Sequence, residues 1–390
     1  MSFGLLTTME RESMHAQILK TSDPEWGRAL RTMPHDFYSL PSYVRLAAQF
    51  EGGEGVAILV EHGERRLLLP LLLRDIPGDL GNRDVRDAVS PYGYPGIGLT
   101  SVDPGGPAAN AFLDEAMVAA IALLRQRGVV SLFIRLNPML PVDAGVLARH
   151  GVVVDHGHTV SINLMEDRER IFSDLRKDHA KNLRRLDRLG FTTSFDDSGD
   201  PAAIAAFVDV YTETMDRLDA SATYYFDTAY VTDLVSALDG RVVIAVVRQG
   251  EEVAAAGIFT EVGTVFQHHL VGTRTAFFPV APSKMIIRDA ALWAKGRGHG
   301  TMHLGGGLGG AEDALFNFKA GFSAGRQLFQ TTRIVIDRPA YDELVAGWEA
   351  RVGRPAGDLT GFFPAYRAAT DTSHRLRGVV RPDVDHRRAG

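Results

Sequence analysis

Apolar residues recur along the 390-residue chain at two spacings, the alternation typical of strands and the longer period typical of helices. The polar turn from Glu61 to Glu64 lies between two strand-length apolar runs and indicates a β-hairpin. For the first half, the pattern predicts a helix over Pro41–Phe50, strands over Gly55–Glu61 and Arg65–Arg74, a Pro- and Gly-rich loop over Ser90–Gly96, a helix over Pro107–Arg127 and a strand over Val129–Leu136.

The second half repeats this order of elements. After an extended segment over Val152–Leu164, the pattern predicts helices over Arg168–Leu189 and Pro201–Leu218, strands over Val242–Arg248, Val253–Thr260 and Thr264–Val271, a helix over Pro282–Gly296 and a strand over Gln330–Ile336. Each half is thus predicted to be an α+β domain with a mostly antiparallel sheet. We expect domains over residues 1–160 and 161–340, a helical segment over 341–370 that packs back on the core, and a basic flexible tail over 371–390.

The composition narrows the classes of function. With 42 basic and 48 acidic residues, the net charge of −6 argues against a protein coated in basic surface for bulk nucleic-acid binding. The chain has no cysteine, which excludes disulfides and thiolate metal sites. We find neither a signal-peptide pattern nor an apolar run of the ~20 residues that span a bilayer, so we expect a cytoplasmic protein without membrane insertion.

The segment Gly300–Gly325 is the most informative part of the sequence. Five glycines fall within residues 305–310, and Lys319, one of only six lysines in the chain, follows them on a helical pattern. On this helix, Lys319 is predicted to reach either solvent or a cleft. Helical spacing turns four apolar residues inward: Ala314, Leu315, Phe318 and Phe322.

The glycines also match the outline of a dinucleotide-binding loop. Gly305, Gly307 and Gly310 satisfy G-x-G-x-x-G between a strand and a helix. However, Glu312 and Asp313 stand at the helix start, where a pyrophosphate would lie, and this disfavours a dinucleotide site. Two alternatives remain, a tight strand-to-helix turn or the backbone rim of a substrate channel.

Two other sets of residues are candidates for chemistry. A basic run over Arg176–Arg188, on the helix predicted over Arg168–Leu189, is either a solvated face or a surface that binds a polyanion such as RNA or a diphosphate. His268 and His269 are adjacent on a predicted strand and point to opposite faces, so we expect one in the core and the other at a cleft. No H-E-x-x-H, G-x-S-x-G or Walker motif is present, and we predict no metal site.

Several short motifs occur in a characteristic order. They are Ser90-Pro91-Tyr92-Gly93-Tyr94, Arg135-x-Asn137-Pro138, Phe172-x-x-Leu175-Arg176-Lys177, Tyr211-x-x-Thr214-x-x-Arg217, Tyr224-Tyr225-Phe226, Pro282-Ser283-Lys284, His303-Leu304-Gly305-Gly306 and Phe316-x-Phe318-Lys319-x-x-Phe322. This order resembles the Fem family of tandem-GNAT aminoacyl transferases in its compact FemX-like form, and related acetyltransferase-like proteins of the GNAT superfamily.

The resemblance implies two GNAT-like domains without a long coiled-coil arm. It also implies transfer of an amino acid from aminoacyl-tRNA to an amine of a small-molecule or peptide acceptor, without a cofactor, in natural-product or cell-wall precursor biosynthesis. Lys319 would act at the transfer site with Phe318 packed beside it, and Arg217 and Tyr225 would hold the acceptor. Further substrate contacts are expected from Tyr224, His268, His269, Tyr92, Arg135, Ser283, Gly306 and Gly307, and tRNA contacts from Lys177, Lys181, Arg184, Arg185 and Arg188.

Two other functions remain as alternatives. A GNAT N-acyltransferase using acyl-CoA would normally carry an [R/Q]-x-x-G-x-[G/A] pyrophosphate loop, and Val271–Ser283 lacks these glycines. A non-catalytic tRNA- or precursor-binding protein is disfavoured because Lys319 and the glycines are retained. The early lysine that binds a precursor's diphosphate in some family members has no clear match, Arg45 being only nearby. This disfavours a UDP-linked or lipid-linked peptidoglycan acceptor.

Overall fold

The computed structural model describes residues 14–80, 85–100, 103 and 105–369, so the expected tail over 371–390 lies outside the described residues. Within them, thirteen strands form one sheet in the order β1-β2-β3-β4-β6-β13-β7-β12-β11-β10-β9-β8, with β5 paired to β3. The strands are β1 (His15–Lys20), β2 (Glu54–His62), β3 (Arg65–Asp75), β4 (Arg86–Val89), β5 (Gly98–Leu99), β6 (Val129–Arg135), β7 (Val152–Asn163), β8 (Phe191–Asp196), β9 (Val242–Gln249), β10 (Glu252–Val262), β11 (Val265–Thr273), β12 (Thr301–Gly305) and β13 (Gly325–Val335).

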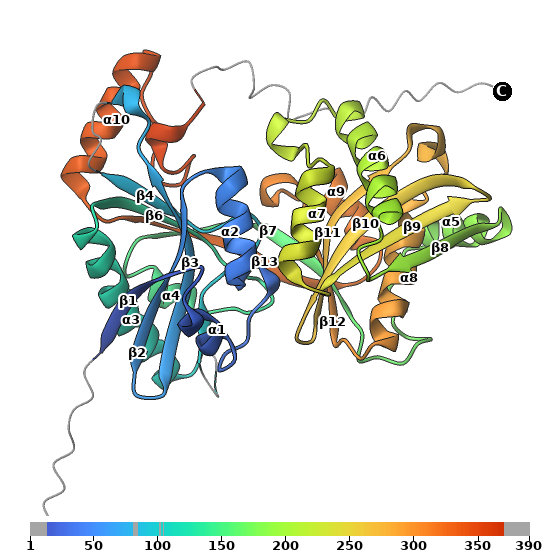
Figure 1. Ribbon diagram of the computed structural model, residues 1–390, viewed down its shortest axis with the longest axis horizontal. Coiled ribbons are helices and arrows are strands. Elements are labelled where there is room, and N and C mark those ends of the chain that lie inside the picture. Colours follow the sequence, from blue (N-terminus) through green and yellow to red (C-terminus); the bar gives the residue numbers. More distant parts are fainter. Residues whose placement is uncertain (1–13, 81–84, 101–102, 104, 370–390) are drawn as a thin grey trace, which may run out of the picture.

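The helices flank this sheet on both faces (Figure 1). They are α1 (Pro24–Leu30), α2 (Pro41–Glu51), α3 (Pro107–Gln126), α4 (Ala144–Leu147), α5 (Lys177–Arg188), α6 (Pro201–Arg217), α7 (Thr228–Leu238), α8 (Ser283–Gly296), α9 (Ala314–Ala320) and α10 (Arg338–Val352). Short 3-10 turns include η1 (Phe37–Ser39) and η4 (Thr275–Val280). Among the described residues the longest helix is α3, with 20 residues, and none forms a long coiled-coil arm.

The two halves of the chain exchange strands at the centre of the sheet. We call the residues before β7 the N-terminal half and those from β7 to α9 the C-terminal half. β7 pairs with β12, whereas β13, which follows the C-terminal half, pairs with both β6 and β7. Only β4–β6 and β11–β12 are parallel, so the predicted α+β fold with a mostly antiparallel sheet is confirmed. The exact domain limits at 160 and 340 stay predictions.

The halves also share a hydrophobic core. One cluster contains residues of α1 and α2 from the N-terminal half together with residues of α6 and α7 from the C-terminal half. The ring of Phe50 at the end of α2 lies 4.5 Å from the ring of Tyr230 on α7. On the opposite face, α3 covers the N-terminal half and α5 and α8 cover the C-terminal half. On one face of the sheet the two halves are therefore packed together through their helices, among them α2 and α7.

Some predicted elements need correction. The helix predicted over Arg168–Leu189 begins only at Lys177, because Arg176 has an extended backbone and its N–H is bonded to the carbonyl oxygen of Gly321 instead. The pattern also missed α1, α7 and β8.

Contrary to the expectation that no segment is long and apolar enough to cross a membrane, α3 meets that test by length and composition, with a mean hydropathy of 1.4. Its apolar face packs in the N-terminal core, as does that of many soluble core helices.

Candidate functional site

The glycine run lies between the end of β12 and the start of α9, and Asp313 organises it. One carboxylate oxygen of Asp313 accepts the N–H of Leu308 at 3.0 Å, and the other accepts the N–H of Phe316 at 2.9 Å, which caps α9. A β-carbon at Gly307 would lie 2.1 Å from the carbonyl oxygen of Ala311, so only glycine fits there. The acidic helix start is thus a cap, and it occupies the position that a bound pyrophosphate would need.

Lys319, near the end of α9, directs its ammonium group back to this loop. The side chain is 7% exposed, and Nζ donates a hydrogen bond to the carbonyl oxygen of Gly306 at 2.7 Å. Burial lowers the pKa of Lys319 from its ordinary 10.5 to about 8, while the nearby carboxylate of Asp313 acts in the opposite direction. Lys319 is therefore a buried donor at the glycine loop, and it is mostly protonated at neutral pH.

The predicted orientation of α9 is partly wrong. Ala314 and Leu315 were expected inward, but both are exposed, Leu315 by 42%. Phe316 and Lys319 are buried instead. The helix has only seven residues, and its first turn follows directly on the cap at the surface, so the apolar spacing of so short a segment does not fix its buried face.

Three buried histidines lie on β11 and β12, and two of them, His268 and His303, are close enough to Lys319 to feel its charge. Burial, followed by the positive charge of Lys319, lowers the pKa of His268 and of His303 to about 3, and burial lowers the pKa of His269 to about 4. Oε1 of Gln267 lies 2.7 Å from Nδ1 of His303, and the Nε2 atoms of all three histidines lack a hydrogen-bond partner among the described residues. The imidazoles are neutral at pH 7, so Lys319 carries the positive charge of the site.

Tyr94 brings the N-terminal half to the same loop. Its hydroxyl oxygen accepts the N–H of Gly306 at 3.3 Å. Its ring lies edge-on to the rings of His303 and Phe329, with both centroids 5.2 Å away. The sequence motifs contain Tyr94 and His303 but gave neither a role, since the two residues are 209 positions apart and meet only through tertiary structure. No local signal identifies this pair.

A second group of predicted residues lies at the junction of the halves. Tyr92 is 39% exposed, and its backbone N–H donates to Oε1 of Glu51 at 2.8 Å. Arg135 is half-buried and donates from Nη1 to the carbonyl oxygen of Ser90 at 2.6 Å. Arg135 and Tyr224 both lie close enough to Tyr92 to influence the pKa of its hydroxyl, and Tyr224 comes from the C-terminal half. The structure therefore brings Tyr92, Arg135 and Tyr224 together, and Tyr94, which acts on Tyr92 electrostatically, links this group to the loop that Lys319 contacts.

Other predicted contacts lie apart from the loop. Nη1 of Arg217 donates to the carbonyl oxygen of Thr273 at 2.9 Å, and the hydroxyl of Tyr225 donates to Asp216 at 2.9 Å. Ser283 is the first residue of α8 and is half-buried. No described contact joins Arg217, Tyr225 or Ser283 to Lys319. Their roles toward a substrate stay predictions.

The basic run forms a stripe on the exposed face of α5. Its five cations are exposed and have no ion pair or hydrogen bond among the described residues, and we call them the α5 stripe: Lys177, Lys181, Arg184, Arg185 and Arg188. The acids of the helix are engaged elsewhere, Asp178 with Arg176 and Asp187 with Arg288. On the buried face, Nε2 of His179 lies 3.0 Å from the carbonyl oxygen of Phe318, and the half-buried ring of Phe318 packs against His179. The helix that carries the stripe is thus attached to the helix that carries Lys319.

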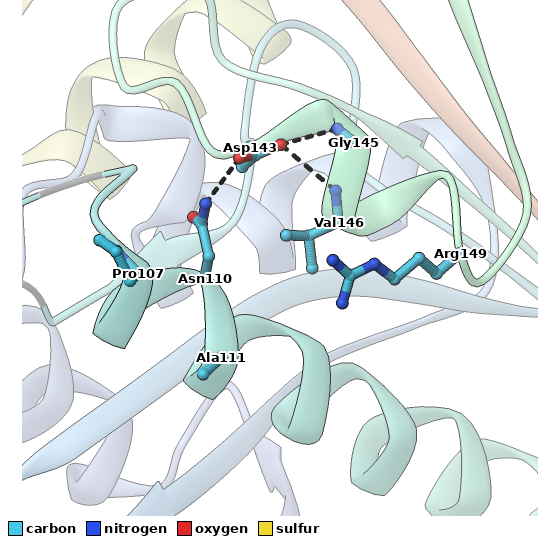
Figure 2. Close-up of a pocket in the computed structure, with 7 residues that line it drawn as sticks. All are labelled: Pro107, Asn110, Ala111, Asp143, Gly145, Val146 and Arg149. Atoms are coloured by element: carbon cyan, nitrogen blue, oxygen red, sulfur yellow. Dashed lines mark hydrogen bonds between the residues drawn. The ribbon is translucent and has the colours of Figure 1, made fainter.

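A surface pocket of the N-terminal half lies between α3 and α4 (Figure 2). Nδ2 of Asn110 donates to Asp143 at 2.6 Å, and the other oxygen of Asp143 accepts the N–H groups of Gly145 and Val146. Asp143 is thus fully engaged, Arg149 pairs with Asp114, and none of the predicted site residues lines the pocket. Among the described residues, no group of three or more histidine or acidic side chains is placed to hold a metal ion.

Comparisons with known proteins identify the fold. Residues 173–319 match the family model of an acetyltransferase (GNAT) domain, a match that ends at Lys319. The chain is similar to the crystal structure of FemX, with a TM-score of 0.63 and 12% identity over 84% of this chain and 99% of that one. No curated protein matches the sequence.

Two further solved structures share the fold. L-PGS from Bacillus licheniformis has a TM-score of 0.50 and 11% identity, covering 80% of this chain and 92% of that one. A conserved protein of unknown function from Bacteroides thetaiotaomicron has a TM-score of 0.52 and 8% identity, covering 82% and 99%. The solved structures show the fold, and the match to the GNAT acetyltransferase domain supports an acyltransferase in general terms. Residues 173–319 thus match a GNAT domain, and the chain as a whole has a FemX-like fold.

Proposed function

We propose that the protein moves an amino acid from aminoacyl-tRNA to an amine of a small-molecule or peptide acceptor and so forms an amide bond. The observation that carries this proposal is the ammonium group of Lys319, buried beside a glycine loop at the junction of the two halves. An amine attacks an aminoacyl ester without further activation, so the enzyme has to align the reactants and stabilise the oxyanion. A buried lysine supplies that positive charge, and the reaction requires no cofactor.

The glycine loop suits this role because it lets a substrate approach the backbone. Lys319 binds the carbonyl oxygen of Gly306, and Asp313 binds the N–H of Leu308, so the glycine-rich backbone is held in one conformation by these two side chains. Such preorganised groups lose little entropy when the reaction proceeds. We therefore assign the acyl carbon of the donor to the space beside Gly305 and Lys319.

The α5 stripe supports a nucleic-acid donor. Four of its cations, at positions 177, 181, 184 and 188, follow one line along the helix. At the rise per residue of an α-helix, this line is roughly 16 Å long. A line of exposed cations without partners in the described part of the chain matches a phosphate backbone, and neutralising phosphates releases counterions. The apolar face of α5 is buried against the core, so the helix has no exposed apolar face for a membrane. The sequence left two interpretations of the stripe open, a solvated face or a site for a polyanion. We propose the second.

An acyl-CoA donor is the alternative, and one feature disfavours it. In the segment before α8, the N–H of Thr275 donates to Oε1 of Glu213 at 2.7 Å, and Arg274 is paired with Glu213 and Asp209. Carboxylates thus occupy groups that a pyrophosphate would need there. This agrees with the absence of the spaced glycines of a pyrophosphate loop from Val271–Ser283.

Replacing Lys319 tests the site. We expect Lys319→Ala to reduce transfer by at least about 10²-fold, the loss typical for one oxyanion-stabilising donor. Circular dichroism and thermal unfolding of the same variant check that the fold is intact. Near-normal transfer by a folded Lys319→Ala variant would remove Lys319 from the mechanism.

A further inference from the structure

We propose that Tyr94, a residue of the N-terminal half, donates a second hydrogen bond to the acyl oxygen during transfer, beside Lys319. This inference rests on the proposed acyl transfer at the glycine loop. It adds a catalytic group from the other half of the chain to the site.

Tyr94 and Lys319 converge on one short stretch of backbone. Tyr94 holds the N–H of Gly306 at 3.3 Å, and Lys319 holds the carbonyl oxygen of the same residue at 2.7 Å. A β-carbon built on Gly305 would lie 3.3 Å from the hydroxyl oxygen of Tyr94 and 3.5 Å from Nζ of Lys319. Both polar groups therefore flank the same face of Gly305, which carries no side chain.

The hydroxyl of Tyr94 has a proton left to donate. A phenol oxygen accepts through its lone pairs and donates through its single proton. The N–H of Gly306 uses one lone pair, and no acceptor for the phenol proton is found among the described residues. Burial raises the pKa of Tyr94, so the group stays protonated at neutral pH. The rings of His303 and Phe329 both contact the ring of Tyr94 edge-on and restrict its orientation.

These positions define a step in which atoms and charges balance. The neutral amine of the acceptor forms the new C–N bond, and the carbonyl electron pair moves onto the acyl oxygen. Lys319 and Tyr94 donate hydrogen bonds to this oxyanion and keep their own protons. When the intermediate collapses, the ester C–O bond breaks, and the proton of the attacking amine ends on the departing ribose oxygen. The oxyanion site is thus complete only when both halves of the chain are in place.

Removing one oxygen atom tests this role. Tyr94→Phe keeps the ring and its contacts, and we expect kcat to fall by about 10²-fold with KM changed by less than about threefold. Tyr341→Phe is the matched control, because the hydroxyl of Tyr341 on α10 also accepts a backbone N–H, that of Ala365, at 3.3 Å. We expect this control to transfer at the wild-type rate.

A fluorinated tyrosine separates donation to substrate from support of the loop. Fluorination makes the phenol a stronger donor and a weaker acceptor. If Tyr94 donates to the oxyanion, the protein with fluorotyrosine at position 94 has a kcat at least equal to that of wild type. If its hydroxyl only supports Gly306, the fluorinated protein is slower than wild type, and the proposal is overturned.

The assays use whichever donor the wild-type protein accepts, aminoacyl-tRNA or acyl-CoA, since both present an acyl oxygen. A wild-type protein that uses only acyl-CoA would contradict the proposed donor and leave the Tyr94 test in force. Conversely, a Tyr94→Phe variant that transfers within about threefold of wild type would overturn the role of Tyr94 and leave the proposed function standing.

Discussion

The burial of Lys319 has a measurable effect on folding stability. Its pKa is about 8 in the folded protein and 10.5 in an exposed reference state. Between these values the unfolded chain binds one proton more than the folded chain, so the stability contributed by this group rises with pH over that window. Each pKa unit corresponds to about 1.4 kcal/mol, so the full effect is about 3 kcal/mol. At neutral pH the charged lysine lowers the free energy of unfolding by that amount relative to high pH.

Urea unfolding of wild type and Lys319→Met at about pH 7 and about pH 10.5 measures this effect, since methionine is an unbranched side chain of nearly the same length without the charge. We expect wild type to gain about 2–3 kcal/mol relative to the variant between the two pH values. Comparing the two proteins cancels the titration of other groups, and replacing the exposed Lys20 by methionine controls for the loss of a lysine elsewhere. An equal difference at both pH values would show that Lys319 is not a buried cation, and the account of the site would fail.

Three more predictions follow from the same contacts. The rate kcat should fall as pH rises through about 8, because Lys319 loses the proton that stabilises the oxyanion, and a rate that stays level there would contradict this role. Gly307→Ala should destabilise the protein by about 1–3 kcal/mol in thermal unfolding, because the new β-carbon meets a carbonyl oxygen, whereas Gly296→Ala, with open space around it, should not. Replacing Arg184 and Arg185 by glutamine should weaken tRNA binding and reduce its salt slope by about 1–2, and an unchanged slope would return the stripe to the solvated surface.

The local elements of this fold could largely be predicted from the sequence. The hairpin of β2 and β3, the long helix α3 and the strands β9 to β11 follow directly from apolar spacing and turn residues. The error at α5 has a physical cause, since Ile171 and Leu175 continue the apolar spacing although the backbone between them and Lys177 is not helical. The exchange of β7 and β13 could not be predicted, because strand pairing over such separations leaves no local pattern.

The candidate site was predictable only in part. Lys319 could be singled out because lysine is scarce in this chain and follows a dense glycine run. Its burial could not be predicted, since a seven-residue helix carries too little periodicity to fix its inner face. Tyr94 and His303 reach the loop from different halves, so their roles depend on the tertiary structure. The α5 stripe was visible in the sequence, but only the structure shows that the acids beside it are paired with other residues.

Identifying the acyl donor that the protein uses is the most direct test of the proposed function. Purified protein is incubated with a crude small-molecule extract as the acceptor and with either labelled aminoacyl-tRNA pools or labelled acyl-CoAs. We expect labelled amide product from aminoacyl-tRNA, no product when the tRNA is digested with RNase beforehand, and none from acyl-CoA. Labelled product from acyl-CoA that is insensitive to RNase would contradict aminoacyl-tRNA-dependent transfer.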